Sequence, residues 1–143
     1  GSRPMKGVKA FFDTNVVLYL LSEDAEKADR AEALLTDGGV ISVQVLNEFT
    51  SVATRKLGMS WVEIREVLTQ LREICAVEPI SLAVHDRAIT IAERYGYSIY
   101  HALILAAALI SGASQLYTEE MQDGQIIDSE LRISDPFKNS DRV

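Results

Sequence analysis

The sequence has few of the features by which several large classes of protein are recognised. It contains a single cysteine, Cys75, which excludes an internal disulfide and is typical of a reducing compartment such as the cytoplasm. With no base motif beside it, Cys75 is expected to be a small core residue. The longest apolar run, Ala102 to Ile110, is far too short to cross a bilayer. No G-x-G-x-x-G or P-loop pattern occurs, which argues against nucleotide binding through a glycine-rich loop.

What is present fits one globular domain. The 143 residues are 48% hydrophobic and 24% charged, which is typical of a folded chain with its own core. Residues 1–4 resemble an expression-vector scar before Met5, so the domain is taken as 5–143. The net charge of −7 argues against strong non-specific binding to nucleic acid. It does not exclude a nuclease, because a carboxylate cluster attracts phosphate once it has bound metal cations.

Short apolar runs alternate with longer segments of helical periodicity. Strands are expected at 8–12, 40–42, 76–80, 115–117 and 131–133, and helices from 14 or 15 to about 21, then at 26–36, 42–56, 60–74, 81–95 and 98–111. This alternation predicts an α/β fold with a mainly parallel sheet. The helix at 98–111 is apolar on nearly every side, so it is expected at the centre of the domain.

Several helix starts carry capping signals. Thr14 or Asn15 is expected to cap the first helix, and Ser98 the last. Ser60 with Glu63 three residues later has the spacing of a capping box.

Acidic side chains stand at the ends of the expected buried elements. Asp13 ends the first strand, Glu120 and Asp123 follow the strand at 115–117, and Glu48 lies on the apolar stripe of the helix at 42–56. Ligands bind open parallel sheets beyond the carboxyl ends of the strands, which is where these acids are expected. Buried acids are costly unless cations or hydrogen bonds satisfy them. The pattern therefore predicts a divalent-metal site.

Each acid also has a plainer interpretation. Asp13 alone would be read as a helix N-cap, and Glu48 could pair with Arg55 or Lys56 on its own helix. Asp123, just before a glycine, has the position of a turn residue as well as that of a site acid. Because Glu120 and its neighbour Glu119 face different ways, only one of the two is expected at the site.

Four motifs in order resemble the PIN-domain family, and in particular its VapC toxin branch. They are the segments 12–16 (FDTNV), 47–49 (NEF), 100–104 (YHALI) and 116–124 (LYTEEMQDG), and the ending 133–137 (ISDPF) is also similar. The resemblance covers the chain from Val8 to about Phe137 and selects Glu120 over Glu119.

The resemblance implies an α/β/α sandwich, a homodimer, and RNA cleavage that depends on Mg²⁺ or Mn²⁺. It also implies a cognate antitoxin as partner, with DNA bound only through that antitoxin and no association with membranes. The site residues that it implies are Asp13, Glu48, position 101, Glu120 and Asp123, of which the four acids would bind metal. Thr14 and Thr118 match hydroxyl positions that can hydrogen-bond the cluster.

His101 departs from the family pattern, which has Asp at this position. Imidazole is a poor ligand for Mg²⁺, and when protonated it satisfies acids without metal. An acid three residues after the Ser98 cap would also suit the helix N-terminus better than a charged histidine. Either the protein is a natural degenerate member, or an Asp was replaced to disarm a toxin. Weakened or absent activity is expected in both cases.

Two further functions compete with an impaired ribonuclease. The acidic pocket could serve a catalytically inactive module that captures a basic antitoxin segment through bidentate Arg–carboxylate pairs. A phosphoryl-accepting domain with Asp13 as nucleophile is disfavoured, because it would need a Lys and a Ser or Thr at later strand ends and only Thr118 qualifies. For the homodimer, the amphipathic segment from Trp61 to Leu71 offers apolar surface.

Overall fold

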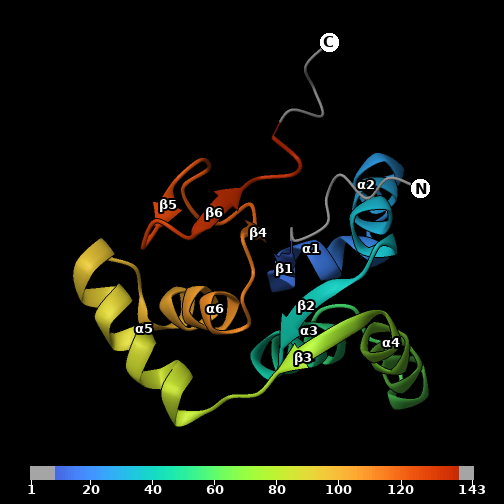
Figure 1. The fold of residues 1–143 in the computed structure, drawn as a ribbon. Coiled ribbons are helices and arrows are strands. Elements are labelled where there is room, and N and C mark those ends of the chain that lie inside the picture. The colour runs from blue at the N-terminus through green and yellow to red at the C-terminus, as the bar shows by residue number, and fades with distance from the viewer. Residues whose placement is uncertain (1–8, 139–143) are drawn as a thin grey trace.

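A six-stranded sheet in the order β3-β2-β1-β4-β6-β5 forms the middle layer of the computed structural model, which describes residues 9–138 (Figure 1). Its strands are β1 (Ala10–Phe12), β2 (Gly39–Ser42), β3 (Cys75–Glu78), β4 (Gln115–Tyr117), β5 (Ile126–Ile127) and β6 (Leu131–Ser134). All neighbours are parallel except β5 and β6, which are antiparallel. The predicted mainly parallel sheet is therefore confirmed. Val8 and the proposed scar at 1–4 lie outside the described residues.

Helices cover both faces of the sheet. They are α1 (Thr14–Leu18), the 3₁₀ helix η1 (Tyr19–Leu21), α2 (Ala25–Thr36), α3 (Val43–Arg55), α4 (Trp61–Ile74), α5 (Leu82–Tyr95) and α6 (Ile99–Ile110). Figure 1 shows α5 and α6 on one side of the sheet and α1, α2 and α4 on the other. This confirms the expected α/β/α sandwich.

The core lies between the sheet and these helices. Seven of the twelve residues of α6 are buried, which confirms its predicted place at the centre of the domain. On the opposite face, Val45, Phe49 and Ala53 form the buried stripe of α3. Cys75 is also buried, and desolvation raises the pKa of its thiol to about 11, so it has the character of a core residue and not of a nucleophile.

The helix caps agree with the sequence signals at all but one position. Both hydrogen bonds of the Ser60–Glu63 capping box are present, and Ser98 caps α6 by accepting from the backbone N–H of His101. The first helix differs, because its N-cap is Asp13 and neither Thr14 nor Asn15. Asp13 directly follows β1 and accepts a hydrogen bond from the backbone N–H of Thr14, so no further residue separates the strand from the helix cap.

Some elements also differ from the predictions. The first apolar helical segment is divided into α1 and η1, and β3 ends at Glu78, before Pro79, which has no N–H to offer a ladder. The short strand β5 was not predicted. It pairs only with β6, and a two-residue strand carries too little periodicity to be recognised in the sequence.

None of the helices within residues 9–138 is long and apolar enough to span a membrane.

The register between β1 and β4 determines where the acids meet. Phe12 lies opposite Tyr117, and the N–H of Asp13 donates to the Tyr117 carbonyl at 3.1 Å. The next residues of the two strands, Asp13 and Thr118, therefore emerge side by side at the carboxyl edge of the sheet.

Candidate metal centre

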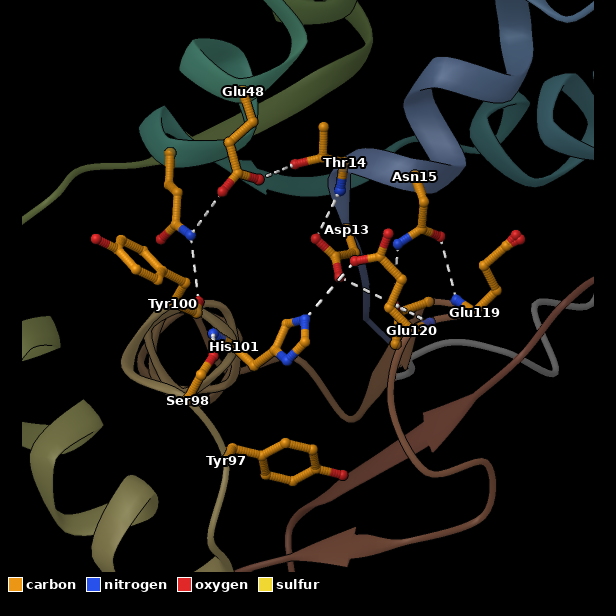
Figure 2. Close-up of polar contacts among 12 residues, drawn as sticks. Asp13, Thr14, Asn15, Glu48, Tyr97, Ser98, Tyr100, His101, Glu119 and Glu120 are labelled. Atoms are coloured by element: carbon orange, nitrogen blue, oxygen red, sulfur yellow. Dashed lines mark hydrogen bonds and ion pairs between the residues drawn. The ribbon is translucent and has the colours of Figure 1, made fainter. Parts of the chain in front are cut away.

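Asp13 lies at the centre of the candidate site and is 3% exposed. Its Oδ1 accepts a hydrogen bond from the Thr14 N–H at 2.7 Å, and its Oδ2 accepts from the Thr118 hydroxyl at 2.9 Å. The Thr118 hydroxyl in turn accepts from the Asn15 side-chain amide at 3.0 Å. The start of α1 and the residue that follows β4, which are far apart in sequence, thus fix the orientation of one carboxylate. Figure 2 shows Asp13 and Thr14 in this arrangement.

The electrostatic environment of Asp13 opposes its ionisation. Desolvation by burial is the largest effect, and together with the nearby Glu120 and Glu48 carboxylates it raises the pKa of Asp13 to about 6. The hydrogen bonds from Thr14 and Thr118 act in the other direction. An ionised Asp13 therefore remains incompletely satisfied by the protein and would gain from a nearby cation.

Glu48 reaches the site from α3, as its place on the apolar stripe predicts. Its Oε1 accepts from the Thr14 hydroxyl at 2.5 Å, and its Oε2 accepts from the Gln44 amide at 3.1 Å. Within residues 9–138 its carboxylate forms no ion pair with Arg55 or Lys56, which was the alternative interpretation. Glu48 is therefore oriented toward α1 and the acid cluster.

Glu120 and His101 face each other across the same site. The His101 Nε2 lies 3.6 Å from the Glu120 Oε1, and the His101 ring packs edge-on against Tyr97 with centroids 6.2 Å apart (Figure 2). The Glu120 backbone N–H donates to the Thr118 hydroxyl at 3.1 Å. His101 consequently lies within ion-pairing distance of the Glu120 carboxylate.

Glu119 has a different role from its neighbour. Its carboxylate accepts from the Tyr19 hydroxyl at 2.6 and 2.7 Å, and its backbone N–H donates to the Asn15 side chain at 3.1 Å. These bonds hold Glu119 toward η1, while Glu120 is turned toward Asp13. This placement favours Glu120 over Glu119, and the role of Glu120 as a site acid stays a prediction.

Asp123 is held apart from the other acids. Its Oδ1 accepts from the Asp135 N–H at 2.8 Å, and its Oδ2 lies 3.5 Å from the Lys138 ammonium. The hydrogen bond from Asp135 is the main cause of the lowered pKa of Asp123. The structure thus favours the loop-stabilising interpretation of Asp123, and its role as a metal ligand stays a prediction.

Two polar residues of the site carry no clear signal in the sequence. The Gln44 amide bridges Glu48 and the Tyr100 carbonyl, to which it donates at 3.2 Å. Asn15 joins the β1 and β4 loops through Thr118 and Glu119. Asn15 stands two residues after Asp13 and could have been proposed from that proximity, but Gln44 is recognisable only once α3 and α6 are placed together.

The donor set suits a hard cation by its chemistry. Asp13, Glu48 and Glu120 offer the carboxylate oxygens that Mg²⁺ and Mn²⁺ prefer. Their side chains are not gathered tightly, and among residues 9–138 no three His, Cys, Asp or Glu side chains are close enough to hold one ion. Hydrogen bonds to Thr14 and Gln44, and the His101–Glu120 contact, occupy two of these acids instead.

Comparison with solved structures shows the same fold in proteins of low sequence identity. A toxin–antitoxin complex from Klebsiella pneumoniae is 23% identical with a TM-score of 0.69, over 90% of this chain and 98% of that one. VapC20 of Mycobacterium tuberculosis, described as a Sarcin-Ricin loop cleaving toxin, is 18% identical with a TM-score of 0.62, over 76% and 87% of the two chains. VapBC2 of Rickettsia felis, bound to a promoter DNA fragment, is 18% identical with a TM-score of 0.63, over 89% and 98%.

A comparison with curated proteins gave no match. The sequence itself matches the family model of the PIN domain over residues 10–122, which begins at β1 and ends beyond Glu120. The match includes the segments that carry Asp13, Glu48, His101 and Glu120. This chain therefore belongs to the PIN-domain family.

Proposed function

We propose that this protein is a metal-dependent endoribonuclease of the toxin–antitoxin type, weakened by His101. The observation that carries the proposal is the buried Asp13 carboxylate, which lies at the carboxyl edge of the sheet with Glu48 and Glu120 beside it. The carboxylates of Glu48 and Glu120 both oppose the ionisation of this buried acid, which is unfavourable in the absence of a cation. The arrangement is therefore better suited to binding metal than to stabilising the fold.

Asp13, Glu48 and Glu120 are the residues that would hold Mg²⁺ or Mn²⁺, with Asp123 as a further, more distant candidate. A bound ion would supply a nucleophilic water and neutralise charge on the scissile phosphate. The protein's own contribution is orientation: Thr118 and the Thr14 N–H fix Asp13, while the Thr14 hydroxyl and Gln44 fix Glu48.

The structural relatives support the toxin interpretation. One of them is described as a toxin–antitoxin complex, one as a toxin that cleaves the Sarcin-Ricin loop, and one as VapBC2 bound to a DNA fragment from its promoter. By this analogy the substrate is RNA, the partner is a cognate antitoxin, and DNA is contacted through the antitoxin. These assignments rest on likeness of fold, and RNA cleavage tests the first of them.

A second candidate function is an inactive module that binds an antitoxin through its acidic pocket. The His101–Glu120 contact favours it, because an imidazolium would neutralise one of the three acids without metal. The remaining carboxylates of Asp13 and Glu48 would then be available to a basic side chain of the partner.

The test compares RNA cleavage by this protein and by its His101→Asp variant, each with Mn²⁺ and with an EDTA control. We expect the variant to cut at least tenfold faster, since Asp adds an oxygen ligand and removes the competing cation. A thermal shift with Mn²⁺ is measured in parallel, and it should be larger for the variant.

Each outcome separates the two functions. Cleavage by the variant alone identifies a ribonuclease scaffold that His101 disarms, and cleavage by both shows that imidazole is tolerated. If neither protein cuts RNA and neither is stabilised by Mn²⁺, the nuclease proposal fails and the antitoxin-binding module becomes the better account.

A further inference from the structure

A surface cleft of about 300 Å³ opens beside the acid cluster, between α1, α3 and the loop after β4. Its lining includes Thr14, Asn15, Leu18, Glu48, Arg55 and Glu120. Two of the three clustered acids thus form part of its wall. A strand whose scissile phosphate lay at the acids would continue through this cleft.

Arg55 is the one basic residue among those that line the cleft. It lies seven residues after Glu48 on α3, which is two helical turns along the same face. Its Nε donates to the Ser51 hydroxyl one turn earlier, at 3.0 Å. This bond uses one N–H of the guanidinium and leaves the N–H groups of both terminal nitrogens for another acceptor.

The neighbouring acids do not neutralise Arg55. Glu48 accepts from Thr14 and Gln44, and Glu120 faces His101. The other arginines and lysines that form ion pairs within residues 9–138 do so away from the cleft: Arg87 and Arg94 pair with Asp128, and Lys138 pairs with Asp123. Arg55 is therefore an oriented cation next to a group of acids, in a chain whose net charge is −7.

We propose that Arg55, oriented by Ser51, binds a phosphate of the RNA strand adjacent to the scissile one. The inference rests on the proposed function and assigns a binding residue for its substrate. Guanidinium is suited to this role because its planar N–H pair matches two phosphate oxygens at once. In an acidic protein, such a contact offsets the repulsion that the strand meets beside the carboxylates.

The test measures the binding of a fluorescein-labelled single-stranded RNA of mixed sequence by anisotropy, with Ca²⁺ present, from about 50 to 200 mM salt. Arg55→Gln is compared with Lys56→Gln, which removes the same charge from an exposed neighbour outside the cleft lining. Arg55→Gln should weaken binding roughly tenfold and reduce the slope of log affinity against log salt by about 0.7, the value for one phosphate contact. Lys56→Gln should leave the slope unchanged.

Arg55→Lys provides a further comparison. It should restore the salt slope, because the charge returns, but only part of the affinity, because an ammonium cannot make the paired contact. If Arg55→Gln and Lys56→Gln behave alike while the unmodified protein binds RNA, the Arg55 assignment is wrong and the proposed function stands. If the unmodified protein binds no RNA at any of these salt concentrations, the Arg55 assignment is also wrong, and the cleavage experiment alone decides the proposed function.

Discussion

At the scale of single residues, Asp13 serves the fold and the site at once. As the N-cap of α1 it stabilises a helix start, and as a buried acid beside Glu48 and Glu120 it resists ionisation. The hydrogen bonds from Thr14 and Thr118 hold the carboxylate in place without removing the cost of its charge. A residue that only capped a helix would be more stable at the surface, where water solvates it.

The raised pKa of Asp13 predicts the pH dependence of an Asp13→Asn variant. The pKa is about 6 in the folded protein, against a usual 3.8 that applies to the unfolded chain. The native state therefore binds the extra proton between these values, and stability is lost as pH rises through 6. Asp13→Asn should avoid this loss, and without metal it should be more stable than the unmodified protein by roughly 2–3 kcal/mol at pH 7.5 and by far less at pH 4.5. Urea unfolding in EDTA measures the difference.

Asp123→Asn is the matched control with the opposite sign. The pKa of Asp123 is lowered, so its contribution to stability is present above its usual value and lost in acid. This variant should therefore be less stable than the unmodified protein at pH 7.5. If Asp13→Asn instead leaves the stability unchanged at both pH values, Asp13 acts as a helix cap alone, because Asn caps a helix about as well as Asp.

At the scale of elements, local signals determine where the helices begin. The Ser60 hydroxyl accepts from the Glu63 N–H at 3.1 Å, and the Glu63 carboxylate accepts from the Ser60 N–H at 2.8 Å. The hydrogen bonds between α5 and the β5–β6 turn, in contrast, join segments that are distant in sequence and form only when the chain is folded. There Asp128, with a positive φ of 51°, accepts from Arg87, Arg94 and Tyr95.

Removing the Ser60 cap should measurably destabilise the protein. Ser60→Ala leaves the Glu63 N–H without its side-chain acceptor, at a cost of about 1 kcal/mol or about 3 °C in Tm. Ser60→Asp keeps an acceptor and should stay within a few tenths of a kcal/mol of the unmodified protein. Thermal unfolding followed by circular dichroism tests both. Equal losses in the two variants would show that the cap is not what stabilises the start of α4.

At the scale of the whole molecule, several large apolar side chains remain in contact with solvent. Trp61 is 62% exposed and Val62 is 71% exposed at the start of α4, and Leu82 at the start of α5 is 76% exposed. Exposed apolar groups gathered on helices are typical of association surfaces. The homodimer expected from the family resemblance therefore remains a prediction, with two candidate surfaces.

Sedimentation equilibrium at micromolar concentration should give twice the 15.8 kDa mass of one chain. Trp61→Glu should shift the protein toward monomer if α4 forms the interface, because a charge would have to be buried against the partner. Leu82→Glu is the comparison on α5, and dissociation by this variant alone would place the interface there. A monomer for the unmodified protein would contradict the dimer itself.

The order and type of most elements could be predicted from the sequence because the signals are local. Ser42, Ser60 and Ser98 each cap the helix that follows, and the strand at 115–117 was predicted with its observed bounds. β5 escapes prediction because it has only two residues. The sequence allows Asp13 as a helix cap but favours Thr14 or Asn15, because a strand end and a helix cap coincide at Asp13. The acids Asp13, Glu48 and Glu120 were recognisable because each is a polar group at the end or on the buried face of an apolar element.

The sequence by itself determined which side chains could meet at the carboxyl edge of a parallel sheet, since periodicity and capping act over a few residues. Only the tertiary structure decided how they are partnered: β1 lies beside β4, Thr118 binds Asp13, and Thr14 binds Glu48. It also decided that Asp123 contacts the Asp135 backbone and the Lys138 side chain, and not the other acids of the predicted metal site. These contacts join residues far apart in the chain. Their geometry follows from strand register and helix packing, which no local pattern encodes.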